Sequence, residues 1–202
     1  MTQNNSTIGV IGAGAWGTAI AKLLSDKNSN VLLWAKEIKV KKDIEKTRIN
    51  KTYLDKIELG KSLKVTNCLE ELKGFDIIFV VVPTQYIQAT LKPLKKIINK
   101  KCILVNCAKG IDIKSTSLIS EVISKVFPDN RLAVMSGPNF ALEIALGKPT
   151  ASLIAAQKIS DAKFIANLIS SKSFRPYLSN DIIGAQICGA MKNIYAIGCG
   201  II

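Results

Sequence analysis

Residues 76–82 carry the pattern that most restricts how this chain can fold. After Asp76 the run reads IIFVVV, without a polar side chain at any position. A strand with one solvent-exposed face alternates polar and apolar residues, so this run predicts a strand covered on both faces. Similar apolar runs predict further strands at 8–11, 31–34, 63–66, 102–106, 132–135, 151–156 and 174–178.

The stretches between these runs set the fold class. Residues 48–62 are expected to be irregular, and Pro93 is expected to kink or divide a helix. Apolar strands separated by helices specify an α/β fold with a doubly wound, mainly parallel sheet. From about residue 180 the pattern changes to one long helical stretch. The other predicted helices are 15–24, 38–47, 68–72, 86–98, 115–126 and 159–170.

The sequence GAGAWG at residues 12–17 joins the first predicted strand to the first predicted helix. In this G-x-G-x-x-G pattern, Gly12 permits a tight turn, Gly14 lets a pyrophosphate approach, and Gly17 allows close helix–strand packing. The helix N-terminus offers free N–H groups to phosphates. A plain glycine-rich turn is the alternative. The strand–turn–helix setting favours a Rossmann-type dinucleotide-binding domain over residues 1–180.

The end of the second predicted strand, WAKE at residues 34–37, bears on the cofactor. An acidic residue at this tip usually bonds the ribose 2′-OH of NAD, whereas a basic residue suits the 2′-phosphate of NADP. Lys36 falls at the expected tip and Glu37 follows it. The sequence therefore leans toward NADPH and leaves NADH open, with two solvated loop charges as the alternative.

Composition argues against several kinds of site and partner. The chain has no histidine, and its five cysteines form no CxxC pair, so we expect neither a metal site nor a histidine-based triad. Cysteines in apolar runs and the lack of a signal peptide favour a reducing, cytoplasmic location. The net charge of +13 suits anionic partners. Its lysine clusters lack interleaved aromatics, so we expect solvated faces rather than nucleic-acid binding.

Residues 182–202 have the length of a membrane span. Lys192 would then lie near the bilayer centre at a cost of roughly 2.5–3.5 kcal/mol. Gln186 and Asn193 add to that cost, and no basic cluster follows them. We therefore expect a helix buried in protein and no membrane span.

Four short motifs occur together in this chain: GAGAWGTA at 12–19, CAKGI at 107–111, SGPNFA at 136–141 and GAMKN at 189–193. In this order they resemble the bacterial NAD(P)-dependent glycerol-3-phosphate dehydrogenases. The resemblance implies hydride transfer between a nicotinamide cofactor and C2 of sn-glycerol 3-phosphate, giving dihydroxyacetone phosphate and feeding glycerophospholipid synthesis. The family continues into an all-helical domain, so residues 181–202 are expected to be its truncated start.

The resemblance also implies roles for single residues. Ala15 and Asn139 stand where the family commonly has serine, although asparagine still offers a donor and an acceptor. Lys192 matches the catalytic lysine. Implied cofactor contacts are Gly12, Gly14, Ala15, Trp16, Gly17, Lys36, Lys109 and Ala141, and implied substrate contacts are Lys109, Gly137, Asn139 and Lys192.

The family holds its substrate phosphate with a Ser-Arg-Asn group in the helical domain, and no such triplet follows Lys192. We therefore expect a fragment that binds the cofactor but whose turnover is in doubt. A homodimer of the full-length protein stays open. So do two other functions. One is a hydroxyacid or ketopantoate-type reductase, against which AKGI at 108–111 argues, and the other is a non-catalytic dinucleotide-binding module.

The residues themselves give a chemical reason for the lysine. Removing a hydride from a secondary alcohol requires its hydroxyl proton to leave, and no histidine is present to take it. A lysine can serve when burial lowers its pKa from about 10.4 to near 7–8. Ala190, Met191, Ile194 and Ala196 predict such apolar surroundings for Lys192. A lysine that extends to the surface is the alternative.

Overall fold

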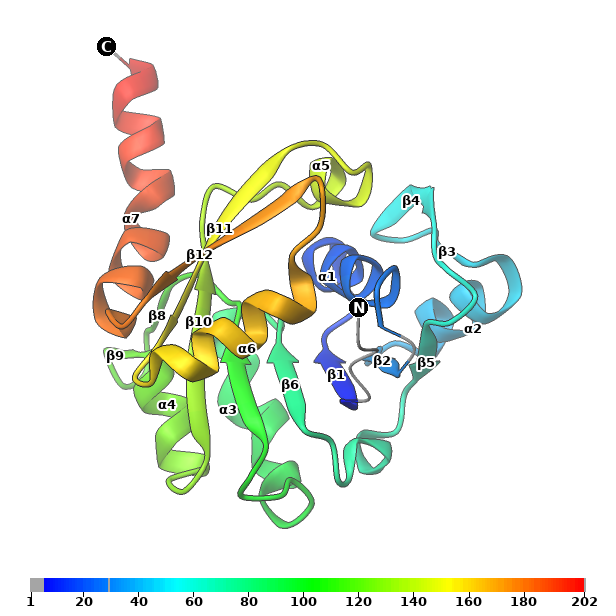
Figure 1. The fold of residues 1–202 in the computed structure, drawn as a ribbon, viewed down its shortest axis with the longest axis horizontal. Coiled ribbons are helices and arrows are strands. Elements are labelled where there is room, and N and C mark those ends of the chain that lie inside the picture. The colour runs from blue at the N-terminus through cyan, green and yellow to red at the C-terminus, as the bar shows by residue number, and fades with distance from the viewer. Residues whose placement is uncertain (1–5, 29, 202) are drawn as a thin grey trace.

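The computed structural model describes residues 6–28 and 30–201. Its centre is an eight-stranded sheet with the order β12-β11-β10-β7-β6-β1-β2-β5 (Figure 1). Neighbouring strands run parallel except β10 and β11, which confirms the Rossmann-like, mainly parallel sheet. The strands are β1 (Ile8–Ile11), β2 (Val31–Trp34), β5 (Lys64–Thr66), β6 (Ile77–Val80), β7 (Ile103–Asn106), β10 (Arg131–Ser136), β11 (Thr150–Ala156) and β12 (Phe174–Ser179).

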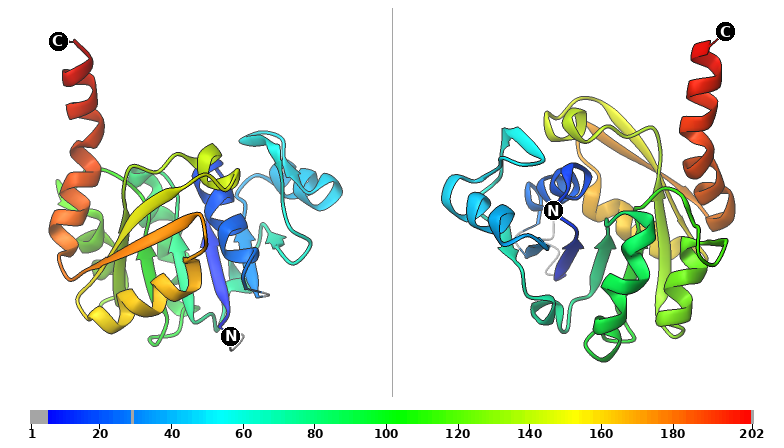
Figure 2. Two further views of the ribbon diagram at one scale, coloured as in Figure 1. Left: turned by 45° about the horizontal axis from the view of Figure 1, so that its top comes forward. Right: turned by 180° about the vertical axis from the view of Figure 1, so that it is seen from behind.

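Helices cover both faces of this sheet and produce one large hydrophobic cluster on each. A third, smaller cluster contains Val134, Ala155 and Ala185. Figure 2 shows α3 and α4 in front of the sheet when the molecule is seen from behind. The first cluster packs under α1 (Ala15–Ser25), α2 (Ile38–Thr47), α5 (Ala141–Ala145) and α6 (Ile159–Ile169). The second packs under α3 (Ile87–Leu91) and α4 (Ile119–Val126).

Strand β6 explains the unbroken apolar run in the sequence. Ile77 and Phe79 belong to the first cluster, and Ile78 and Val80 belong to the second. All four side chains are fully buried. Alternate residues of a strand point to opposite faces, so a strand between two helix layers needs an apolar residue at every position.

Four segments differ from the sequence-based expectation. The stretch 48–62 is not irregular, because it contains an antiparallel hairpin of β3 (Ile49–Asn50) and β4 (Leu54–Glu58). The helix expected over 115–126 begins only at Ile119. Before it, β8 (Ile111–Asp112) and β9 (Ser117–Leu118) form a second hairpin.

The third difference lies at 86–98, where no continuous helix forms. The chain passes from a 3₁₀ turn at Thr84–Tyr86 through α3 to a second 3₁₀ turn at Lys92–Lys96. Pro93 lies in that second turn. A proline lacks the N–H that would continue an α-helix, so the predicted division occurs there. A further 3₁₀ turn at Leu69–Leu72 replaces the short helix expected at 68–72.

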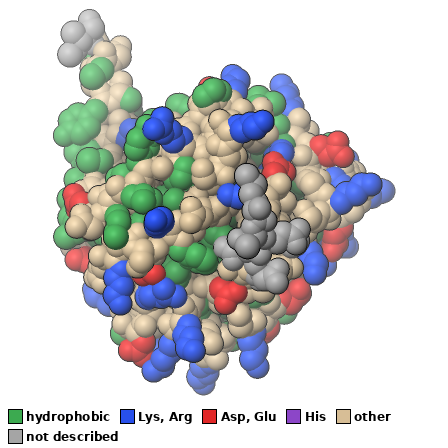
Figure 3. Space-filling model, viewed as in Figure 1, with side chains coloured by type: hydrophobic (Ala, Val, Ile, Leu, Met, Phe, Trp, Pro, Cys, Tyr) green, Lys and Arg blue, Asp and Glu red, His purple; other side chains and the backbone are tan. Residues whose placement is uncertain are grey.

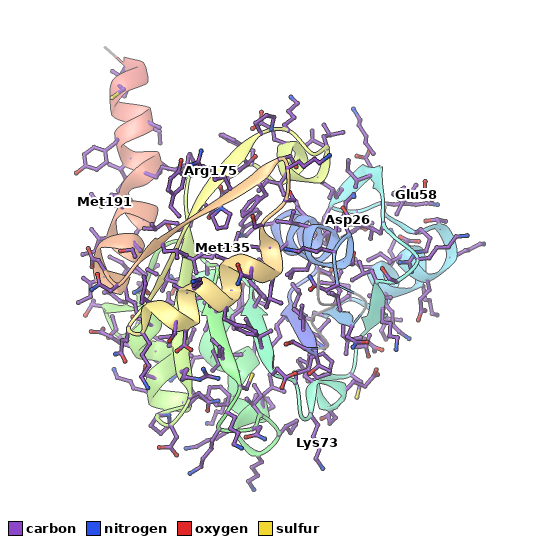
Figure 4. All side chains as sticks on the ribbon, viewed as in Figure 1. Asp26, Glu58, Lys73, Met135, Arg175 and Met191 are labelled. Atoms are coloured by element: carbon purple, nitrogen blue, oxygen red, sulfur yellow. The ribbon has the colours of Figure 1, made fainter. Side chains whose placement is uncertain are left out.

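The last element, α7, spans Ile182–Ile201 and projects beyond the sheet (Figures 1 and 2). Its first turns are anchored by Gln186, which is buried. The Ser120 N–H donates to Gln186 Oε1 at 2.9 Å, and Gln186 Nε2 donates to Ser120 Oγ at 2.8 Å. In Figure 4, Met135 lies within the sheet, whereas Met191 lies on the projecting helix.

The expectation that this whole helix is buried in protein is wrong for the described residues. Only Ala185 and Gln186 of α7 are buried, while Ile194, Tyr195 and Ile197 are exposed. The start of α7 packs against β10 and β11, whereas its second half projects beyond the sheet (Figure 1). None of the helices within 6–28 and 30–201 is both long and apolar enough to span a membrane.

Candidate functional site

The glycine loop between β1 and α1 is shaped by two close approaches. Gly12 has a φ of +116°, and a Cβ there would lie 2.8 Å from the Val81 carbonyl oxygen. A Cβ on Gly17 would lie 1.8 Å from the carbonyl oxygen of Gly12. In contrast, a Cβ on Gly14 would meet nothing within 4 Å. The loop is therefore closed on its protein side and open at Gly14.

The N-terminus of α1 can receive an anion. Gly14 is its N-cap residue, and no side chain caps the helix there. The first N–H groups of a helix have no partner within the helix and carry a partial positive charge. Since these groups border the opening at Gly14, this end of α1 suits the pyrophosphate of a dinucleotide.

A cavity of about 1090 Å³ lies at the carboxyl ends of the parallel strands. It extends from the glycine loop to the loops after β2, β6, β7 and β10, and reaches α7. This is the crevice in which doubly wound sheets bind ligands. Every residue implied as a contact lines it except Gly137, namely Gly12, Gly14, Ala15, Trp16, Gly17, Lys36, Lys109, Asn139, Ala141 and Lys192.

Trp16 and Lys109 meet in the middle of this cavity. The indole Nε1 of Trp16 donates to the carbonyl of Cys107 at 3.2 Å, which fixes the ring against the end of β7. The Lys109 ammonium lies 6.0 Å from the centroid of the same ring. Its Nζ donates to the carbonyl of Gly137 at 2.7 Å. Gly137 therefore borders the site through Lys109.

Lys109 is half-buried, and its pKa is lowered from the ordinary lysine value. Burial is the larger cause, because it disfavours the charged ammonium. The positive charge of Lys192 is the second cause. The two amines are thus near enough to repel each other across one cavity.

Lys192 lies on α7, partly buried, with its Nζ 5.0 Å from the centroid of the Phe140 ring. This is cation–π distance. The apolar enclosure expected around it does not form within the described chain. Ile194 and Ala196 are exposed, and Phe140 itself is 60% exposed. The described residues bring Lys192 to the cavity but bury it only in part.

Asn139 contributes an unpaired acceptor. Its side chain is buried, and Nδ2 donates to Ser152 Oγ at 3.1 Å. Ser152 Oγ in turn donates to the Ser136 carbonyl at 3.0 Å. Asn139 Oδ1 has no hydrogen-bond partner among the described residues. A buried acceptor without a partner is costly, so this oxygen suits a hydroxyl donor from a ligand.

At the far end of the cavity, Lys36 and Glu37 follow β2. Lys36 is exposed, whereas Glu37 accepts a hydrogen bond of 3.0 Å from the Tyr53 hydroxyl. This bond and the negative charge of Glu37 raise the pKa of Tyr53. Sequence reasoning missed Tyr53, because its contact joins residues sixteen positions apart through the β3–β4 hairpin.

Asn50 is a second residue that sequence reasoning missed. Its side chain is fully buried, and Nδ2 donates to the Ala13 carbonyl at 2.8 Å and to Thr18 Oγ1 at 2.8 Å. The glycine loop is therefore held from outside by the β3–β4 hairpin. An Asn in a segment without regular hydrophobic spacing gave no signal of this role.

The cysteines fall into a buried group and an exposed group, whereas the surface charges are mixed. Cys102 and Cys107 are buried, whereas Cys68, Cys188 and Cys199 are exposed, and all five are free. Within the described ranges, His, Cys, Asp and Glu side chains form no cluster of three that could hold a metal. On the face shown in Figure 3, Lys and Arg side chains are spread out and interspersed with Asp and Glu.

A mainly parallel sheet with a glycine turn opening onto a crevice at its carboxyl edge defines a dinucleotide-binding α/β protein. The family model for the N-terminus of NAD-dependent glycerol-3-phosphate dehydrogenase matches residues 7–162. The chain belongs to this family.

Relatives in other organisms agree with this assignment. Glycerol-3-phosphate dehydrogenase (NAD(P)+) of Hyphomonas neptunium is 41% identical over 201 residues, which cover 100% of this chain and 60% of the relative. The enzyme of that name from Parvibaculum lavamentivorans is 38% identical over 202 residues, covering 100% and 61%. The chain thus spans about three-fifths of the length of these relatives.

A solved structure shares the fold. The crystal structure of glycerol-3-phosphate dehydrogenase from Coxiella burnetii matches with a TM-score of 0.90 and 32% identity. The match covers 97% of this chain and 60% of that one. The arrangement of sheet and C-terminal helix is therefore common to both.

Proposed function

We propose that this chain is the cofactor-binding part of an NAD(P)-dependent glycerol-3-phosphate dehydrogenase and carries its catalytic lysine. The reaction is the interconversion of sn-glycerol 3-phosphate and dihydroxyacetone phosphate by hydride transfer at C2, which feeds glycerophospholipid synthesis. The observation that supports this most is one cavity lined by the glycine loop, Lys109, Asn139 and Lys192. Residues 1–180 would form the dinucleotide-binding domain, and residues 181–202 would begin a helical substrate domain.

The residues present fit a dinucleotide. The open side of Gly14 and the uncapped start of α1 would hold the pyrophosphate, and Lys36 would lie beside the adenosine ribose. Trp16 and Ala141 line the cavity farther along. When bound, the nicotinamide ring supplies or accepts the hydride.

The protein's own part of the chemistry is proton transfer and orientation. The Lys192 amine would take the proton of the C2 hydroxyl during oxidation and return it to the carbonyl oxygen during reduction. Lys109 is a half-buried cation whose lowered pKa reflects burial and the charge of Lys192. It would hold the substrate oxygen, and Asn139 Oδ1 would accept from a substrate hydroxyl.

The first experiment measures cofactor binding by the chain as it is. Calorimetry with NADPH and NADH should give saturable binding that Gly14→Ala weakens. Lys192→Ala should leave cofactor affinity nearly unchanged, because its amine is assigned to the substrate. A folded chain that binds neither cofactor would refute the proposal.

The second experiment tests the reaction. A chimera that adds the part of the Hyphomonas neptunium relative beyond the matched region should oxidise NADPH with dihydroxyacetone phosphate and lose that rate on Lys192→Ala. Consumption of NADPH only with ketopantoate would favour the reductase alternative. Cofactor binding without turnover in the chimera would favour a non-catalytic binding module.

The remaining proposals concern location and partners. All five cysteines are free, which supports a reducing compartment and hence the cytoplasm. The proposed partner is a small phosphorylated substrate. On the face shown in Figure 3, acidic and basic side chains are interspersed and form no continuous basic track of the kind that nucleic acids require.

A further inference from the structure

The β3–β4 hairpin joins two separate parts of the nucleotide cavity. Asn50 at its start bonds the Ala13 carbonyl of the glycine loop at 2.8 Å. The Oδ1 atom of the same Asn50 accepts from the Tyr53 N–H at 3.2 Å. Tyr53 then reaches Glu37, at the tip of β2, through its hydroxyl. One short segment therefore ties the tip of β2 to the glycine loop.

Tyr53 and Glu37 both line the cavity, beside Lys36. Tyr53 is 42% exposed, and its hydroxyl donates to Glu37 Oε1 at 3.0 Å. Lys36 takes part in none of the ion pairs found between described residues. The carboxylate at this tip is thus engaged, whereas the ammonium next to it is free.

We propose that Tyr53 determines which nicotinamide cofactor this site prefers, by holding the Glu37 carboxylate against the hairpin and away from the ribose 2′ position. The inference rests on the proposed dinucleotide site. A carboxylate free at this tip bonds the 2′-OH of NADH and repels the 2′-phosphate of NADPH. With Glu37 held by Tyr53, Lys36 can pair with that phosphate, and the site prefers NADPH.

The anchoring of Tyr53 makes this control specific. Its backbone is fixed by Asn50, which is fully buried and bonded to the glycine loop. A tyrosine has only two side-chain torsions, so its hydroxyl has little freedom once the backbone is placed. The position of the Glu37 carboxylate is therefore set relative to the loop that would hold the pyrophosphate.

The test is a double-mutant cycle read as the ratio of dissociation constants for NADH and NADPH. The unsubstituted chain should prefer NADPH. Tyr53→Phe removes only the hydroxyl and should narrow the preference by about fivefold, the equivalent of one hydrogen bond. NADPH should bind more weakly and NADH more tightly, because the released carboxylate now competes for the 2′ position.

The second arm removes the charge that Tyr53 acts upon. Glu37→Gln should keep or widen the preference for NADPH, and Tyr53→Phe in that background should change the ratio no further. An equal effect of Tyr53→Phe in both backgrounds would overturn the inference, since Tyr53 would then act on the cofactor directly. So would a preference for NADH in the unsubstituted chain.

Tyr177→Phe is the matched control, because Tyr177 is exposed on β12 and does not line the cavity. It should leave the ratio unchanged. Binding of both cofactors with a ratio that Tyr53→Phe does not alter would refute this inference and leave the proposed function standing. A folded chain that binds neither cofactor would refute both.

Discussion

The ammonium of Lys109 donates a 2.7 Å hydrogen bond to the carbonyl of Gly137 and so links the loop after β7 to the loop after β10. Its aliphatic stem also approaches α7, since a Cβ on Gly189 would lie 3.8 Å from Lys109 Cγ. Lys109 therefore touches three separate parts of the cavity wall. Its protonation state should respond to changes in each of them.

Lys109 should titrate below the ordinary lysine pKa, and Lys192→Ala should raise its pKa part of the way back. Burial is the larger cause of the lowering and persists in the variant, whereas the repulsion from Lys192 is removed. Carbon-detected NMR of the lysine side chains would measure the change. Lys73→Ala removes an exposed lysine outside the cavity and should have no effect. If Lys192→Ala left the pKa of Lys109 unchanged, the two amines would not be close enough to interact.

Gly17→Ala and Gly14→Ala should separate folding from binding. A Cβ on Gly17 would lie 1.8 Å from a backbone oxygen, so the free energy of unfolding should fall by about 2–4 kcal/mol. A Cβ on Gly14 meets no protein atom within 4 Å, so that variant should stay near the original stability but bind NADPH more weakly. Urea denaturation and calorimetry would measure the two effects. Equal stability losses would show that the loop is not open at Gly14.

Gln186→Ala should loosen α7 from the sheet. The side chain makes two hydrogen bonds with Ser120 in a buried setting, and their loss should lower the free energy of unfolding by about 1–3 kcal/mol. Amide hydrogen exchange across Ile182–Ile201 should accelerate more than exchange in the sheet. Gln157→Ala, at an exposed position, is the control. Equal exchange in both variants would mean that α7 is held by other contacts.

Stability should fall at alkaline pH because of the buried thiols. Burial raises the pKa of Cys102 from 9.0 to about 12, and it also raises the pKa of Cys107. The unfolded thiol ionises first, so the folded state binds more protons and loses stability as the pH rises from about 9 toward 12. In this window, each buried thiol should lower the free energy of unfolding by up to about 1.4 kcal/mol per pH unit.

Denaturation at pH 8 and pH 10 would measure this loss. Cys102→Ala should reduce the pH dependence, and Cys188→Ala, which removes an exposed thiol, should not. An identical dependence in the Cys102 variant would show that the thiol does not stay protonated when folded.

Most of the sheet could be predicted from the sequence, because a strand that is buried on both faces appears as a continuous apolar run. Strand β6 is the clearest case, since each of its residues faces one of the two apolar clusters. The β3–β4 hairpin has no such apolar run. Its two buried β4 residues, Leu54 and Ile57, are three positions apart and therefore lack the alternation of a strand.

Residues of the candidate site could be predicted where they belong to a short sequence motif. They could not be predicted where contacts between distant residues bring them to the cavity. The glycine loop, Lys109 and Lys192 were found from short motifs, and they line one cavity. Tyr53 was not found, because its bond to Glu37 depends on how the hairpin folds back. The surroundings of Lys192 were also mispredicted. An apolar helix indicates that something covers it but does not say which residues do.

Because β10 and β11 are antiparallel, changes in loop length should be tolerated differently at the two rims of the sheet. Residues 137–149 leave β10 and enter β11 at the rim that holds the cavity. An insertion there would move Asn139 and Ala141 relative to Lys109. Residues 127–130 and 157–158 lie at the opposite rim, and none of them lines the cavity. Length variation among homologues should therefore accumulate at the second rim and be rare at the first.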